Sequence, residues 1–371
     1  MKKIEKNIHN LVIFTSVFPV GSKAVSGIFV YKIAKFLKAS FNVNIFFMTN
    51  QFSYFKFLRM KKEPGIHEDF TFTILPYLSL GFPAIFKAIP QLFSAVFFGL
   101  FLMSSDSTRT YYGKFKFGAI LAVLFSKFKG GTSFGDFGES DFNRSSHFYP
   151  NFLLRYVLKN IDSAICLNKN IYNIVTEVRG NSDGIYLLYN GVDVKSFTPF
   201  VGPKIKSKKI KCLFVGHFIP RKGVKEASSA ILLANKLGIF IGSGPLKPSG
   251  SHIMKSETVH HFDLPSYYQN ADIFVFPSYN EGSPNALIEA ISSGLPVVGW
   301  DLPFMRDHTN KDFAILVEPG DVNGLADAIN FICEKPNIHN MMSISARNYA
   351  RYNFSLFERN KKILKIIKEA K

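Results

Sequence analysis

The sequence predicts an α/β protein built from two doubly wound, Rossmann-like domains that face a cleft. The chain has 371 residues, more than one hydrophobic core usually serves, so its length favours about two domains. Strand-like apolar runs alternate with helical periodicity along most of the chain, which is typical of parallel α/β layers. A composition of 47% hydrophobic and 19% charged residues argues against a disordered or coiled-coil protein.

The first domain is predicted to cover residues 1–198. An apolar run from Leu11 to Val20 reads as a buried first strand and loop, and a helical pattern follows from Ile28 to Leu37. Lys2 and Lys3 before this run also fit a secretory signal peptide. No small-residue cleavage site follows the run, so the buried strand is favoured.

Residues 84–103 are an apolar stretch of 20 residues with only one charge, which makes them a candidate membrane segment. Three interpretations stay open: a buried or domain-packing helix, a helix at a membrane surface, and a spanning helix. Lys87 and Pro90 count against a spanning helix, and the packing helix is favoured.

A linker is predicted at residues 199–210, which are rich in Pro, Gly and Lys and lack periodicity. The second domain, at 211–345, repeats the alternation of strands and helices more clearly. Residues 346–371 are expected to form a C-terminal helix that could pack back on the first domain.

The formal net charge is +18, and residues 1–200 hold 23 Lys and Arg against 12 Asp and Glu. A basic surface attracts nucleic acid, anionic lipid headgroups or phosphorylated ligands, and composition does not choose among the three. Cys166, Cys212 and Cys333 stand far apart, with no CxxC pair and no histidine at ligand spacing. Neither a disulfide framework nor a zinc site is indicated, and a reducing compartment fits best.

The most informative segment runs from residue 273 to 298. It predicts a strand, a loop, and a helix with Ser283 as N-cap and Pro284 as its first residue. Such a helix starts at the carboxyl edge of a parallel sheet, where open α/β proteins bind ligands. Free N–H groups at the start of this helix would suit a diphosphate. They belong to Ser283, Asn285 and Ala286, since Pro284 has none.

Two glutamates belong to this segment. Glu281 precedes the helix and Glu289 lies about two turns inside it. Carboxylates accept hydrogen bonds from sugar and ribose hydroxyls but repel phosphate, so the two ends of the site are chemically distinct. An isolated pair at this spacing would be read as solvated surface carboxylates, whereas the strand, the cap and the glycine stop at Gly294 favour a binding role.

A second segment runs from Phe214 to Val224. An apolar strand delivers Gly216, where a ligand can approach the backbone, and Arg221 and Lys222 follow five residues later. Two cations facing a helix N-terminus would hold a diphosphate. The Gly-rich turn with Gly244 also follows a strand, but such turns are common and the signal is weak.

The stretch from about residue 214 to 319 resembles the nucleotide-sugar domain of the family 4 glycosyltransferases. The likeness is strong after residue 155 and weak from about 50 to 110, and the first loop is similar to that of members that build bacterial surface polysaccharides. The matching motifs are Glu281 with Glu289, Gly216 with Arg221-Lys222-Gly223, Asn190-Gly191-Val192-Asp193, residues 271–278, and Pro19 with residues 26–30.

This resemblance implies the GT-B fold and a retaining glycosyltransferase of the hexosyltransferase type. Such an enzyme moves a sugar from a nucleotide-sugar donor to a glycan or lipid-linked acceptor. The implied donor contacts are the diphosphate for Arg221 and Lys222, the ribose for Glu289, the transferred sugar for Glu281, and the phosphate for Gly27 of the first domain.

The acceptor side departs from the family pattern. The family often has a His-Gly pair, and the corresponding stretch here has Phe137 in place of the histidine. Glu139 and Asp141 could take a polar role there, and loop carboxylates are an equally open interpretation. The chain has no Asp-x-Asp, the element that commonly holds a divalent cation in the other major glycosyltransferase architecture. We therefore expect no metal and no cofactor besides the donor substrate.

Two alternatives stay open: a GT-B nucleotide-sugar epimerase, which would need no acceptor, and a basic peripheral membrane protein without catalysis. Zinc spacing, an aromatic RNP motif and basic helical repeats are lacking, which argues against a nucleic-acid partner. A cytoplasmic protein is expected. Its docking on the anionic inner face of the cell membrane is a further possibility, because a surface-polysaccharide acceptor is usually lipid-linked.

Overall fold

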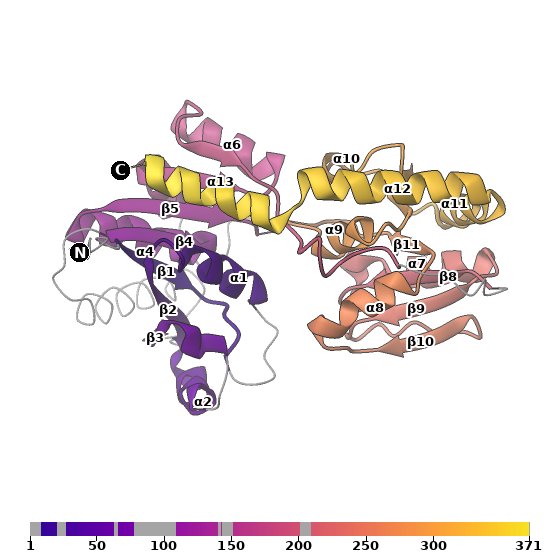
Figure 1. Ribbon diagram of the computed structural model, residues 1–371, viewed down its shortest axis with the longest axis horizontal. Helices are drawn as coiled ribbons and strands as arrows, with labels where there is room; N and C mark the ends of the chain where they lie inside the picture. The colour runs from indigo at the N-terminus through magenta and orange to yellow at the C-terminus, as the bar shows by residue number, and fades with distance from the viewer. Residues whose placement is uncertain are drawn as a thin grey trace, which may run out of the picture. The chain divides into compact units, whose positions relative to one another are not determined.

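The computed structural model describes residues 9–20, 27–62, 66–77, 109–139, 142, 151–200 and 209–370. The chain divides into two compact units (Figure 1). The first unit comprises residues 1–188 and 360–371, and the second comprises residues 189–359.

The described part of the first unit holds a seven-stranded sheet with the order β3-β2-β1-β4-β5-β6-β7, in which every pairing is parallel. Its carboxyl edge carries the loops that follow each strand, and the strand order reverses between β1 and β4. The strands are β1 Asn10–Thr15, β2 Asn42–Asn50, β3 Thr71–Tyr77, β4 Arg109–Lys114, β5 Thr132–Phe137, β6 Ser163–Cys166 and β7 Ile185–Leu187.

Helices cover both faces of this sheet. Leu11 and Ile13 of β1 pack in one apolar cluster with α1, whereas Val12 and Phe14 pack in another with α4, as the period of two in a strand requires. Residues Ile363, Ile366 and Ile367 of α13 join the α1 cluster. The helices are α1 Ile28–Leu37, α2 Gln51–Lys61, η1 Ile66–Asp69, α4 Phe115–Lys129, α5 Asn151–Asn160, α6 Lys169–Arg179 and α13 Leu356–Glu369.

The second unit has a parallel sheet of six strands within its described residues, with the order β10-β9-β8-β11-β12-β13. The order reverses between β8 and β11, and ligands of open α/β sheets bind at such a switch point. The strands are β8 Lys211–Val215, β9 Leu237–Ile241, β10 Ile253–Glu257, β11 Ile273–Phe276, β12 Val297–Trp300 and β13 Ala314–Val317.

Helices and short 3-10 turns connect these strands. One apolar core of the second unit includes residues from α7, α9, α11 and α12 together with the strands. The elements are η2 Pro220–Lys222, α7 Val224–Leu233, η3 His261–Asp263, α8 Leu264–Gln269, α9 Asn285–Ser292, α10 Pro303–His308, α11 Val322–Glu334 and α12 Pro336–Asn353. Both units are therefore doubly wound, as the sequence predicts.

The division between the units differs from the predicted linker at 199–210. Val192 and Phe197 are buried in the core of the second unit. Arg347 of α12 donates hydrogen bonds to the carbonyl oxygens of Val194 and Phe197, each at 2.7 Å. These contacts join residues 189–198 to the second unit.

The C-terminal segment also divides differently from the predicted helix at 346–371. A break near Phe354 separates α12 from α13. Ala346 and Ala350 of α12 are buried in the second unit, and only residues from Asn360 onward belong to the first.

The candidate membrane stretch at residues 84–103 lies outside the described residues. Across the part of the chain that the structure describes, no helix has the length and apolar character needed to cross a membrane.

Candidate functional site

A cation–carboxylate cluster lies where β8 and β11 end. The Lys222 ammonium is 2.5 Å from Oε1 of Glu281, and the Arg221 guanidinium is 3.7 Å from Oε2. Both cations sit on the short turn η2, and Glu281 sits in the loop after β11. The residues at the two predicted motifs, 59 positions apart in sequence, therefore meet.

Gly223 explains why η2 lies so close to β11. Its φ is +67°, and a Cβ at this position would lie 2.0 Å from the carbonyl oxygen of Pro277. Any larger residue would push η2 away from the end of β11. Gly216, in contrast, has no contact closer than 3.8 Å around its Cβ position, so the protein itself leaves space at that position.

Ser278 contacts the same carboxylate oxygen as Lys222. Its hydroxyl, which is fully buried, donates to Oε1 of Glu281 at 2.6 Å. Glu281 is only 9% exposed, and a buried carboxylate needs partners of this kind. Lys222 is thus already paired with Glu281, a contact that the sequence did not predict, while the Arg221 side chain is 38% exposed and also donates to the Asn280 carbonyl oxygen.

Helix α9 begins one residue later than predicted. Asn285 is its first residue and Pro284 its N-cap, so the assignment of Ser283 as N-cap and Pro284 as first helical residue is wrong. The reason is local: the Asn285 N–H donates to the Ser283 carbonyl oxygen at 2.9 Å, and no side chain caps the helix. The side chain of Asn285 instead accepts a hydrogen bond from Asn190 at 3.0 Å.

Glu289, one turn into α9, has a partner that the sequence did not indicate. The Tyr268 hydroxyl on α8 donates to its Oε2 at 2.9 Å. Burial raises the pKa of Tyr268 well above its ordinary value, and the nearby Glu289 charge raises it further. Tyr268 therefore stays protonated and fixes the orientation of the Glu289 carboxylate. Glu281 and Glu289 lie in separate clusters of contacts.

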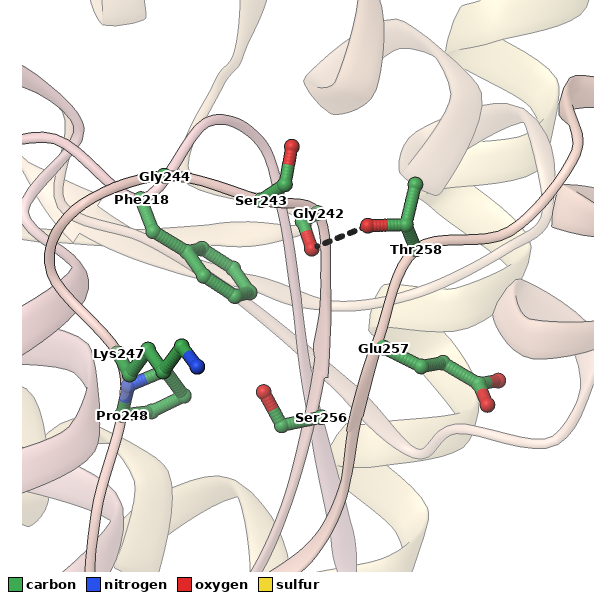
Figure 2. A pocket seen from close by; sticks show the side chains of 9 residues that line it. All are labelled: Phe218, Gly242, Ser243, Gly244, Lys247, Pro248, Ser256, Glu257 and Thr258. Carbon is green, nitrogen blue, oxygen red and sulfur yellow. Dashed lines mark hydrogen bonds between the residues drawn. The ribbon is translucent and has the colours of Figure 1, made fainter.

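A hollow of about 390 Å³ lies at the carboxyl ends of β9 and β10. Figure 2 shows the Phe218 ring in it, with the Lys247 side chain on one side, while the Glu257 carboxylate points away. Thr258 donates to the Gly242 carbonyl oxygen at 3.1 Å, which joins the two strand ends.

Gly244 supports this hollow from the predicted Gly-rich turn. A Cβ at Gly244 would lie 2.4 Å from the Phe218 carbonyl oxygen. The Phe218 N–H donates to the Ser243 carbonyl oxygen at 2.8 Å. The turn therefore packs closely against the loop that carries Phe218, and this close approach requires glycine at position 244.

The remaining predicted residues belong to the first unit. Gly27 is the N-cap of α1 with φ +82°, and a Cβ there would lie 2.7 Å from the Phe18 backbone nitrogen. Close approach to the chain's own backbone thus accounts for this glycine. Asp141 lies outside the described residues.

Glu139 is half-buried, and both of its carboxylate oxygens accept backbone hydrogen bonds. Lys116 N–H donates to Oε1 at 2.5 Å and Gly138 N–H to Oε2 at 3.1 Å. Burial raises the pKa of Glu139, and these hydrogen bonds oppose the shift. The carboxylate therefore ties the end of β5 to the start of α4.

A buried ion pair joins β4 to β5, and the sequence did not predict it. Lys114 at the end of β4 lies 2.8 Å from Asp136 of β5, and the two side chains are 4% and 1% exposed. Phe137, in the place of the family histidine, is fully buried with its ring 5.5 Å from that of Phe142. The acceptor-side position is thus filled by an apolar contact.

Comparison with known proteins defines the class. Two doubly wound parallel units form the GT-B fold, and HepE from Anabaena, solved in complex with UDP, has a TM-score of 0.72 at 13% identity over 98% of this chain and 100% of its own. Residues 209–335 match the family described as glycosyl transferases group 1. This part of the second unit is therefore similar to group 1 glycosyltransferase domains, and the narrower assignment to family 4 stays a prediction.

Curated relatives agree with this class. A putative teichuronic acid biosynthesis glycosyltransferase TuaC from Bacillus subtilis is 34% identical over 32% of this chain and 31% of its own length. A UDP-Gal:α-D-GlcNAc-diphosphoundecaprenol α-1,3-galactosyltransferase from Escherichia coli is 26% identical over 56% of this chain and 57% of its own. The alignments thus span less than two thirds of these relatives.

Proposed function

We propose that this protein is a retaining glycosyltransferase that moves a sugar from a nucleotide-sugar donor to a glycan or lipid-linked acceptor during synthesis of a bacterial surface polysaccharide. The observation that carries the proposal is the meeting of Arg221, Lys222 and Glu281 at the switch point of the second unit. The relatives' names, which include a diphosphoundecaprenol-linked acceptor, supply the substrate classes.

The donor diphosphate would lie between η2 and the N-terminus of α9. Arg221 is 38% exposed and can turn to an incoming phosphate, and charge-assisted hydrogen bonds of this kind contribute about 1.5 to 3 kcal/mol each. Lys222 would share its charge between Glu281 and the diphosphate. The positive end of α9 adds a favourable field.

The nucleoside would occupy the hollow at the ends of β9 and β10. The buried Phe218 ring gives this hollow an apolar wall, and Lys247 offers a donor. Glu289, oriented by Tyr268, would accept hydrogen bonds from the ribose hydroxyls. The UDP that HepE binds makes uracil the first base to test.

Breaking the bond from the anomeric carbon to the diphosphate places positive charge on the sugar and negative charge on the leaving group. Arg221, Lys222 and the α9 N-terminus would stabilise the leaving group by preorganised electrostatics. Glu281, with one oxygen held by Ser278 and Lys222, would present the other to the sugar. We propose that this chemistry proceeds without a metal, which the lack of an Asp-x-Asp element supports.

The first unit would bind the acceptor and dock on the anionic inner face of the cell membrane. Its basic excess supports this proposal. The three free cysteines fit a reducing cytoplasm, where this transfer would take place.

The test incubates the protein with a panel of nucleotide sugars, with and without a bacterial lipid extract, and follows products by mass spectrometry. We expect acceptor-dependent gain of one sugar and release of the nucleoside diphosphate, abolished in Arg221→Ala/Lys222→Ala. Isomerisation of a donor without any acceptor would instead indicate an epimerase. No reaction with any nucleotide sugar of the panel would contradict the proposal.

A further inference from the structure

Helix α5 of the first unit, Asn151–Asn160, carries an unusual outer face. Phe152 is 74% and Tyr156 is 48% exposed, although both carry large aromatic rings. Arg155 and Lys159 are exposed beside them. The four positions follow the spacing i, i+3, i+4 and i+7, so they form one continuous stripe along the helix.

The opposite face of α5 packs firmly against the rest of the first unit. Val157 and Leu158 are fully buried in the cluster that α5 shares with α4 and α6. The helix is thus anchored by its inner residues, and its rings point outward from a fixed support.

Exposed aromatic rings with adjacent cations recur across the described part of the first unit. Its other exposed large apolar side chains are Phe55 on α2 and Phe128 on α4. Phe55 is followed by exposed Lys56, and Phe128 is preceded by exposed Lys127. Only α5, among the described helices of this unit, has two such rings and two cations on one face, and its sequence contains no acidic residue.

We propose that the stripe of Phe152, Arg155, Tyr156 and Lys159 is the surface by which the protein docks on an anionic lipid bilayer. Aromatic rings favour the interface between headgroups and acyl chains, and flanking cations bind anionic headgroups. A surface that binds a protein partner typically has an apolar centre and a polar rim. On α5, in contrast, cations alternate with rings along the stripe.

The place of α5 in the fold suits this role. It follows β5, so its first turn lies toward the carboxyl edge of the parallel sheet, where open α/β domains bind ligands. A bilayer that contacts α5 would bring a lipid-linked acceptor to that edge. Docking and delivery of the acceptor both rest on the proposed function, whereas the exposure and composition of the stripe do not.

The test is co-sedimentation of the full chain with phosphatidylcholine vesicles and with vesicles that also contain phosphatidylglycerol. We expect binding to the anionic vesicles only, weakened by salt. Arg155→Gln/Lys159→Gln should lower the partition coefficient about thirtyfold. Each basic residue near such a surface contributes a factor of about five, and the two factors multiply. Phe152→Ser/Tyr156→Ser should lower it at least about tenfold and leave the remaining binding more sensitive to salt.

Matched controls keep the proposal falsifiable. Leu232→Ser/Leu233→Ser removes two exposed apolar side chains of α7 in the second unit, and Phe55→Ser/Arg59→Gln removes a ring and a cation of α2. Both should bind vesicles like the wild type. Loss of binding in the α2 variant alone, equal binding of all variants, or no binding by the wild type would overturn the proposal. Sugar transfer to a water-soluble acceptor, unchanged in the α5 variants, separates a failure of docking from a failure of the proposed function.

Discussion

Substitution of Lys222 by alanine removes the cation that pairs with Glu281 and is proposed to bind the donor diphosphate. The paired side chains are 16% and 6% exposed, so the variant leaves a largely buried carboxylate with one cation fewer. Loss of one partner from a fully buried pair costs about 3 to 5 kcal/mol. Because Lys222 keeps some contact with solvent and Arg221 lies 3.7 Å from Glu281, we expect about 2 to 3 kcal/mol.

The Lys222→Ala/Glu281→Ala double variant separates stability from catalysis. It removes both charges, so it should regain at least about 1 kcal/mol of the unfolding free energy that Lys222→Ala loses, as expected for coupled neighbours. Urea unfolding of the wild type, both single variants and the double variant measures this coupling.

Catalysis should not recover in the double variant. Lys222→Ala should lower kcat/KM about ten- to a hundredfold, since each 1.4 kcal/mol is tenfold, and the double variant should be no more active. Strictly additive losses of unfolding free energy would refute the pairing. Unchanged kcat/KM in folded Lys222→Ala would refute the diphosphate role.

Three further predictions concern the carboxylates. Glu289→Ala should weaken binding of the nucleoside diphosphate whereas Glu281→Ala should mainly slow sugar transfer; equal losses of affinity by calorimetry would show that this division of roles is wrong. Tyr268→Phe should weaken the same nucleotide about five- to tenfold through lost orientation of Glu289, with no further effect in the Glu289→Ala background; an undiminished effect in that background would exclude the mechanism. The raised pKa of Glu139 means that the folded protein holds its proton more tightly than the unfolded chain, whose value is near 4.5. Stability should therefore fall as pH rises above that value, and Glu139→Gln should lack this slope. The same pH dependence of the melting temperature in wild type and Glu139→Gln from about pH 4.5 to 7 would contradict the raised pKa.

The fold could be predicted because its signals are local. Runs such as residues 211–215 and 273–276 are apolar over the length of one strand, and the structure places β8 and β11 there. The unit boundary could not, because Val192 and Phe197 are isolated apolar residues in a segment without periodicity, and only the packed core shows that they belong to the second unit.

The sequence predicts candidate site residues but not the contacts among them. Each motif identifies its own strand end, yet the pairing of Lys222 with Glu281 joins residues far apart in sequence. The same holds for Tyr268 with Glu289, where an ordinary apolar position on α8 acquires a polar function only through its depth and its neighbour. Such contacts depend on how elements pack, which periodicity does not encode.

The central claim is that the cluster at the ends of β8 and β11 binds the donor diphosphate. The most direct measurement is calorimetric titration of wild type and Arg221→Ala with the nucleoside diphosphate and the nucleoside monophosphate of the preferred base. We expect Arg221→Ala to lose about tenfold or more in affinity for the diphosphate and much less for the monophosphate, which has one phosphate fewer. Equal losses for the two ligands, or none for the diphosphate, would contradict the claim.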